Sequence, residues 1–329
     1  MNFSAAVRWP ITSLMLTALV VSSLAGVLDA EPATPPGVEQ QPAARFRTGV
    51  EAVSVTAAVR DRRGRVVRGL RKGDFQVIDG GRLREVRDFY AGEAAISLAI
   101  LLDISGSMAV GGNMDRARHA VHVVTGLLGS SADEAALFTF DARLQEVVSF
   151  TGDLERLRRV SLEGRPWGLT SLYDAVAQAA SAVADRANRH RALLVITDGI
   201  DTGSRLTAPE VSGIAASIDV PIYLLVVVAP VDHPGERLAV VSADGASTGT
   251  ATLADLARWT GGDMRIASAP AHTLAAARDL LGELRYQYLL TFEPDPRPGW
   301  HPLEIRTRQD DLTVHARGGY LSGPARSEY

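Results

Sequence analysis

The chain has 329 residues, of which 46% are hydrophobic and 22% charged, and its formal net charge is −4. These values are typical of a globular protein and exclude an overall positive field that would attract nucleic acid or an anionic membrane. Cysteine is absent, which excludes disulfides, thiol nucleophiles and thiolate metal sites. The length exceeds that of one typical domain, so we expect a large domain and a smaller one.

The first 30 residues have the layout of a secretory signal. Arg8 supplies a positive charge, residues 11–21 are mostly apolar, and small residues then allow cleavage after Ala25 or Ala30. An uncleaved membrane anchor is the alternative, but serine and threonine interrupt the apolar run. We therefore predict export to the periplasm or the cell exterior, with no membrane contact beyond this segment.

Residues 31–46, "EPATPPGVEQQPAARF", are rich in proline, glutamine and alanine and predict a disordered linker. Residues 47–92 alternate between apolar and polar positions and contain turn pairs, which predicts short antiparallel strands. A basic run from Arg60 to Lys72 lies in this region. We favour a solvated β edge, protected against aggregation by its charge, over a surface that binds nucleic acid.

From residue 96 to residue 284 apolar runs alternate with segments of helical period. The expected strands are 98–102, 135–140, 192–196, 221–228 and 263–267, with 144–150 as a hairpin partner; the expected helices are 114–128, 172–188, 207–218, 252–260 and 271–284. This alternation predicts an α/β domain with a doubly wound, mostly parallel sheet that is covered by helices on both faces. Residues 231–249 interrupt the pattern and predict a surface loop or hairpin.

Strand patterns return at residues 286–322, and a tail of residues 323–329 follows. Neither this segment nor residues 47–92 is long enough for a stable sandwich alone. We therefore expect the two flanks to pair into one small β-sandwich-like domain, with the α/β domain inserted between them.

Oxygen-bearing side chains gather where the expected strands of the α/β domain end. The run "LAILLDISGSMAV" contains Asp103, Ser105 and Ser107, while Thr170 precedes a helix and Asp198 follows another strand. In an open parallel sheet, ligands bind at the carboxyl ends of the strands. Two carboxylates and three hydroxyls are hard donors that suit Mg²⁺, Mn²⁺ or Ca²⁺ rather than Zn²⁺ or Cu²⁺. Taken singly, such residues are also common helix caps.

Together these five residues resemble the metal-ion-dependent adhesion site, or MIDAS, of von Willebrand factor A (vWA) domains, and the strand–motif–helix context of residues 96–284 is similar. The flanking "DRRGRVVRGLRKGDFQVIDGG" and "VHARGGYL" resemble bacterial VWFA-related proteins first grouped from acidobacterial genomes. The resemblance implies that Ser105, Ser107 and Thr170 bind the metal directly. It implies that Asp103 and Asp198 act directly or through water, and that one position is left for water or for an acidic residue of a partner.

We therefore predict a non-enzymatic module that binds a protein ligand offering an acidic residue. Two alternatives remain: a structural envelope or matrix protein with an idle metal site, and a metal-dependent hydrolase. The α/β domain contains no lysine, and no histidine adjoins the motif to act as a base, so hydrolysis is disfavoured. The sequence leaves the partner and the oligomeric state open.

Two histidines and one tryptophan are further candidates for functional residues. His119 and His122 lie three positions apart on an expected helix, as metal ligands can, but no third ligand is placed with them, so we favour an exposed helix face. Trp167 lies beside Thr170 and is a candidate contact for a partner, although packing against the sheet would also explain it.

Overall fold

A computed structural model describes residues 52–129, 132–230 and 252–322. The predicted signal, the linker, the interrupting segment 231–249 and the C-terminal tail lie outside the described residues. Within the described ranges, no helix combines the length and apolar character needed to cross a membrane.

A six-stranded sheet forms the centre of the α/β region. Its order is β10 (Met264–Ala267), β9 (Ile222–Val227), β8 (His190–Thr197), β5 (Ile96–Asp103), β6 (Glu134–Phe140) and β7 (Leu144–Thr151). The first five strands are parallel, and β7 pairs antiparallel with β6 as the predicted hairpin. Every residue of β5 is buried, because helices cover both faces of the sheet.

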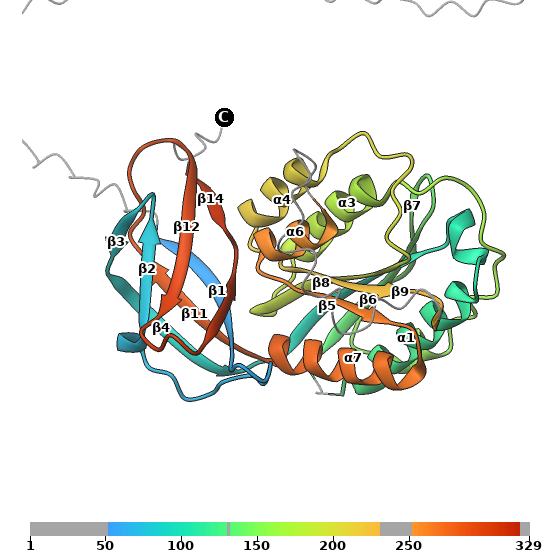
Figure 1. Cartoon of the computed structure of the whole chain (residues 1–329), viewed down its shortest axis with the longest axis horizontal. Helices are drawn as coiled ribbons and strands as arrows, with labels where there is room; N and C mark the ends of the chain where they lie inside the picture. The colour runs from blue at the N-terminus through green and yellow to red at the C-terminus, as the bar shows by residue number, and fades with distance from the viewer. Residues whose placement is uncertain (1–51, 130–131, 231–251, 323–329) are drawn as a thin grey trace, which may run out of the picture. The chain divides into compact units, whose positions relative to one another are not determined.

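The helices lie in two layers, one on each face of this sheet (Figure 1). One layer holds α1 (Asn113–Leu127), the short α2 (Leu154–Arg158) and α7 (Pro270–Arg285); the other holds α3 (Leu172–Ala184), α4 (Ala208–Ser217) and α6 (Leu253–Thr260). The predicted fold class is confirmed. Helix α2 and two 3₁₀ turns, η1 (Lys72–Asp74) and η2 (Gly106–Ala109), have too few residues for a helical period to be recognised in the sequence.

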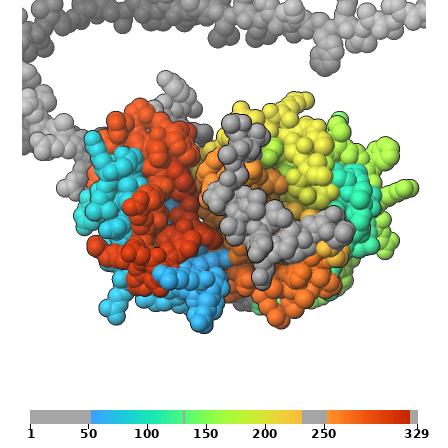
Figure 2. Space-filling model, viewed as in Figure 1, coloured from blue at the N-terminus to red at the C-terminus, as the bar shows by residue number. Residues whose placement is uncertain are grey.

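The two flanking segments pair with each other, as predicted. One four-stranded sheet has the order β13 (Thr313–Ala316), β1 (Val53–Arg60), β11 (Tyr286–Phe292), β4 (Val86–Glu93), and the other has the order β14 (Gly319–Ser322), β12 (Gly299–Thr307), β2 (Phe75–Asp79), β3 (Arg82–Arg84). All their pairings are antiparallel. In Figure 2 the strands of the N-terminal flank, in blue and cyan, meet those of the C-terminal flank, in red.

The two antiparallel sheets share an apolar core that draws on both flanks. Val55 and Val77 come from the N-terminal flank, and Tyr288, Phe292 and Ile305 come from the C-terminal flank. Because each flank supplies only part of this core, each needs the other in order to bury its apolar face.

One residue of the basic run departs from its prediction. Arg60, at the end of β1, is only 5% exposed, and its guanidinium forms ion pairs with Asp263 at 3.1 Å and with Glu283. The prediction of a solvated β edge is therefore wrong for Arg60, which joins the β sheets to the α/β region. Residues 61–71 form a turn and loop that returns to β1 at one point, where Val66 makes an antiparallel bridge with Arg60.

Candidate metal site

The candidate site begins at the carboxyl end of β5, in the middle of the parallel sheet. The Asp103 side chain is fully buried there, and each of its carboxylate oxygens accepts a hydrogen bond. The backbone N–H of Ser105 donates to Oδ1 at 2.9 Å, and the Thr197 hydroxyl donates to Oδ2 at 2.6 Å. Since Thr197 is the last residue of β8, these bonds fix Asp103 between two neighbouring strand ends.

The two serines follow at alternate positions and face each other. Ser105 Oγ and Ser107 Oγ lie 3.1 Å apart, with Ser105 buried and Ser107 half-buried. The chain enters η2 at Gly106, and this turn brings Ser107 back beside Ser105. The structure therefore places the two hydroxyls together at the end of β5, where the Ser105 side chain also interacts with Asp103.

Thr170 lies on a loop that is bonded to the serine turn. The backbone N–H of Gly106 donates to the carbonyl of Gly168 at 3.1 Å, and that of Trp167 donates to Ile104 at 3.0 Å. Thr170 itself is 2% exposed. In the described part of the chain its hydroxyl makes no hydrogen bond to the serines, so the loops, rather than a direct contact, bring it to this edge.

Asp198 follows β8 and is half-buried, and its Oδ1 accepts the N–H of Ile200 at 3.4 Å. Its charge acts on Asp103. Burial raises the pKa of Asp103 to about 6, the hydrogen bonds from Ser105 and Thr197 oppose this increase, and repulsion from Asp198 adds to it. The charge of Asp198 therefore disfavours the ionised form of Asp103 at this edge of the sheet.

The donors present fit a hard divalent cation. Asp103 is a buried carboxylate, yet among the described residues no arginine, lysine or histidine forms an ion pair with it. Its hydrogen-bond partners are neutral, and the surrounding side chains offer hydroxyl and carboxylate oxygens. Mg²⁺, Mn²⁺ and Ca²⁺ prefer such ligands, and a bound cation would offset the burial of the charge.

A second group of acidic side chains lies elsewhere, between α7 and the β sheets. Ligand atoms of Asp263, Glu283 and His315 lie within 4.8 Å of one another, which is close enough for a shared metal ion. However, the Arg60 guanidinium contacts both carboxylates, and the Tyr223 hydroxyl donates to Glu283 at 2.9 Å. The protein therefore supplies its own cation here, and we interpret this group, which we call the arginine cluster, as structural.

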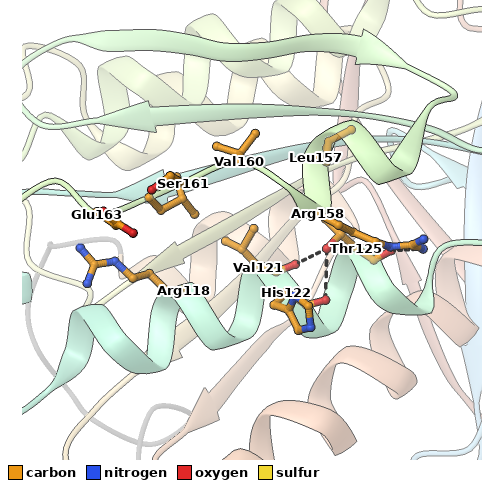
Figure 3. Close-up of a pocket in the computed structure, with 10 residues that line it drawn as sticks. Arg118, Val121, His122, Thr125, Leu157, Arg158, Val160, Ser161 and Glu163 are labelled. Carbon is orange, nitrogen blue, oxygen red and sulfur yellow. Dashed lines mark hydrogen bonds between the residues drawn. The ribbon is translucent and has the colours of Figure 1, made fainter.

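The two histidines considered from the sequence are exposed on α1. His122 borders a pocket of about 280 Å³, shown in Figure 3, where the Thr125 hydroxyl donates to the carbonyls of Val121 and His122. Arg158 also lines this pocket, and its guanidinium donates to the Thr125 carbonyl at 2.8 Å. Since the arginine is already engaged, the pocket offers no free cationic group at that point.

Two residues that support the site were not predicted from the sequence. Thr197 bonds Asp103 directly, and the Thr202 hydroxyl accepts the N–H of Thr170 at 3.0 Å. Thr197 could have been found from its position, because it is the last strand residue before Asp198 and lies on a neighbouring strand end. Thr202 gives no comparable signal, since it belongs to an irregular loop.

Comparison with known proteins gives a family match to part of the α/β region. Residues 98–200 match the family model of the von Willebrand factor type A domain, whereas no curated protein matches the chain. Among solved structures, similar ones include an aerotolerance-related membrane protein from Bacteroides fragilis, at 18% identity and TM-score 0.43, covering 58% of this chain and 98% of that chain.

Two more solved structures are similar at low identity. A von Willebrand factor type A protein from Catenulispora acidiphila has 13% identity and TM-score 0.43, covering 85% of this chain and 76% of that chain. Proximal thread matrix protein 1 from the mussel byssus, with a zinc-occupied MIDAS motif, has 15% identity and TM-score 0.45, covering 61% and 48%. Residues 98–200, which match the family model, lie within the region of the doubly wound sheet, so the α/β region of this chain contains a stretch that is similar to the von Willebrand factor type A domain.

Proposed function

We propose that this chain is an exported, non-enzymatic vWA protein that binds a protein partner through a divalent cation, Mg²⁺, Mn²⁺ or Ca²⁺. The observation that carries the proposal is the buried Asp103 carboxylate, which has neutral donors and a second carboxylate around it instead of a basic partner. Export rests on the N-terminal sequence alone.

The proposed roles follow the chemistry of the donors. The hydroxyls of Ser105, Ser107 and Thr170 would bind the cation directly, and Asp103 and Asp198 would act directly or through water. Neutral hydroxyls leave much of the cation's charge uncompensated, so an anionic ligand from outside is favoured. The side-chain carboxylate of a partner's aspartate or glutamate meets this requirement.

Binding is favoured over hydrolysis by the contacts of the serines. A serine nucleophile needs an adjacent base, whereas the hydroxyls of Ser105 and Ser107 bond to each other. In the described ranges no histidine ring bonds to either of them. The stretch "GASTG" at 245–249 has the spacing of a nucleophile elbow but lies outside the described residues.

The first half of the test is cation binding by the purified chain. Mn²⁺ is titrated into the protein, and free Mn²⁺ is followed by electron paramagnetic resonance. We expect one tight site in the wild type, and at least tenfold weaker binding in Ser105→Ala and Thr170→Ala, because each removes a ligand oxygen. Ser149→Ala is the matched control, since this exposed serine on β7 bonds only locally to Glu146.

The second half is recognition of a carboxylate by the bound cation. N-acetyl-aspartate amide is added to the Mn²⁺-loaded protein at millimolar concentration, with N-acetyl-asparagine amide as the control. We expect the aspartate compound alone to displace water from Mn²⁺ and so to lower the relaxation of water protons. Absence of a Mn²⁺ site, or equal responses to the two compounds, would contradict the proposed function.

A further inference from the structure

Large apolar side chains that are close in sequence to the proposed metal ligands face solvent. Val110 is 68% exposed, Trp167 82%, Leu169 59% and Ile200 52%. Each lies within three residues of a proposed ligand: Val110 follows Ser107, Trp167 and Leu169 precede Thr170, and Ile200 follows Asp198. We call these four residues the apolar rim. Of these four, only Trp167 was proposed from the sequence as a partner contact.

The backbone of the rim is held in place although its side chains are free. Besides the bonds that join Trp167 to Ile104 and Gly106 to Gly168, the carbonyl of Thr170 accepts the N–H groups of Thr202 and Gly203, each at 2.9 Å. Gly168 has a φ of +92°, a left-handed conformation that lets the chain turn between Trp167 and Leu169. Hydrogen bonds therefore join the three loops to one another. Because their backbone is already ordered, little backbone conformational entropy would be lost on binding.

The exposure of the rim needs a reason, because soluble proteins seldom gather large apolar side chains on one exposed surface. The other exposed large hydrophobic residues of the described surface lie on strands away from these loops: Leu83, Tyr90, Val147, Trp300 and Leu321. Rigid aromatic and aliphatic side chains that border a polar centre are typical of the energetically important part of a protein interface.

We infer that the partner is a polypeptide segment in which an acidic residue stands between bulky apolar residues, so that the apolar rim buries these neighbours when the carboxylate reaches the cation. This inference rests on the proposed function, since the cation holds the carboxylate. It adds the source of affinity and selectivity: the cation selects the acid, and the rim selects its neighbours. A peptide is suited to this because its side chains are spaced closely enough to meet both features.

The test uses three labelled synthetic peptides and the purified chain with saturating Mn²⁺. Gly-Leu-Asp-Phe-Gly carries both features, Gly-Ser-Asp-Ser-Gly lacks the apolar neighbours, and Gly-Leu-Asn-Phe-Gly lacks the charge. Fluorescence anisotropy gives the affinities. We expect the first peptide to bind at least about tenfold more tightly than the second, which is a modest gain for burying two large side chains. The third peptide should not bind detectably.

Variants connect the effect to the rim. Trp167→Ala should reduce the preference for the first peptide over the second to less than about threefold, while leaving the affinity of the second unchanged. Trp300→Ala is the matched control, because Trp300 is 49% exposed but lies on β12 in the flanking sheets. Both substitutions are at exposed positions, and circular dichroism verifies that each variant is folded.

The outcomes separate the inference from the function beneath it. Equal affinity for the two acidic peptides, or a preference that survives in Trp167→Ala, overturns the role of the rim and leaves the proposed function intact. Failure of both acidic peptides to bind, or binding that persists with a chelator, contradicts the proposed function itself. Equal binding of the asparagine and aspartate peptides would also contradict the proposed function, because the cation would then not select a carboxylate.

Discussion

The molecule contains two places where carboxylates are drawn together, and they differ in what neutralises them. In the arginine cluster, the guanidinium of Arg60 contacts both Asp263 and Glu283. At the candidate metal site, Asp103 has neutral hydrogen-bond donors, and Asp198 adds a second negative charge nearby. Both groups contain carboxylates, but among the described residues only the first has a cationic side chain in contact with them.

This difference appears when Asp103 is compared with Glu283, although burial also raises the pKa of Asp263 in the arginine cluster. Burial raises the pKa of Asp103 to about 6. Burial also raises the pKa of Glu283, but the hydrogen bond and charge of His315 and the charge of Arg60 outweigh it, so that the net pKa is below its ordinary value. A buried carboxylate that is paired with basic side chains of the same chain has a structural role. A buried carboxylate whose charge is not compensated is suited to bind a cation from solution.

The largest expected effect comes from removing the internal cation. Arg60→Met should lower the free energy of unfolding by about 3–5 kcal/mol, because Glu283, whose side chain is fully buried, then loses the guanidinium that pairs with it. Urea unfolding followed by circular dichroism measures this change. Arg87→Met is the matched control: its ion pair with Glu293 is exposed, and its loss should cost at most about 1 kcal/mol.

Similar losses of stability in Arg60→Met and Arg87→Met would contradict the structural role of the arginine cluster. A double variant, Arg60→Met with Glu283→Gln, sharpens the same point. Removing both charges should restore part of the lost stability, because an uncompensated buried charge costs more than an absent pair.

The next effect is stabilisation by metal at the other site. A ligand that binds only the folded state stabilises it by about 2.7 kcal/mol when its concentration is 100 times the dissociation constant. We expect Mg²⁺ or Mn²⁺ to raise the melting temperature of the wild type. Asp103→Asn should abolish this response while leaving the metal-free protein folded, since the amide keeps the size of the side chain and removes the buried charge.

Calorimetry with and without metal measures the melting temperatures of the wild type and of Asp103→Asn under one set of conditions. Stabilisation of the Asp103→Asn variant equal to that of the wild type would place the cation elsewhere. Arg60→Met supplies the complementary control, because its metal response should persist even though its melting temperature is lower.

The smallest effect concerns pH and the arginine cluster. Burial alone lowers the pKa of His315, but its hydrogen bond with Glu283 and the charges of Glu283 and Asp263 outweigh this, so that the net pKa is raised. A raised histidine pKa gives stability that is fully present below about pH 6.5 and is lost as the pH rises through the folded-state value.

Unfolding free energies of the wild type and of His315→Gln, measured from pH 5.5 to pH 8.5, provide the test. The advantage of the wild type should shrink as the pH rises above 6.5. An advantage that grows over this range would mean that the neutral imidazole is the stabilising form, and would contradict the assignment of His315 to the arginine cluster.

The sequence predicted those features that depend on local pattern. The alternation of apolar runs with helical segments was sufficient for the α/β sheet, and Asp103, Ser105 and Ser107 were found because they follow a buried strand at alternate positions. Asp198 was proposed from the rule that parallel strands end at one edge of the sheet, whereas Thr170 was proposed from its place before a helix and from the family resemblance.

The features that were missed depend on distant partners. Arg60 belongs to a run of similar arginines, and its partners Asp263 and Glu283 are more than 200 positions away, so nothing near Arg60 marks it as buried. Leu169 and Ile200 were missed for the opposite reason. A single apolar residue in a loop is usually assumed to pack inward, and only the bonded geometry of the loops shows these two facing solvent.

The most direct test of the central claim is a crystal structure grown with MnCl₂, with anomalous scattering recorded near the manganese absorption edge. Our account predicts one strong anomalous peak within bonding distance of the Ser105 and Ser107 hydroxyls, and none among Asp263, Glu283 and His315. A peak in the arginine cluster, or no peak beside Ser105 and Ser107 at saturating Mn²⁺, would contradict the assignment of the metal site.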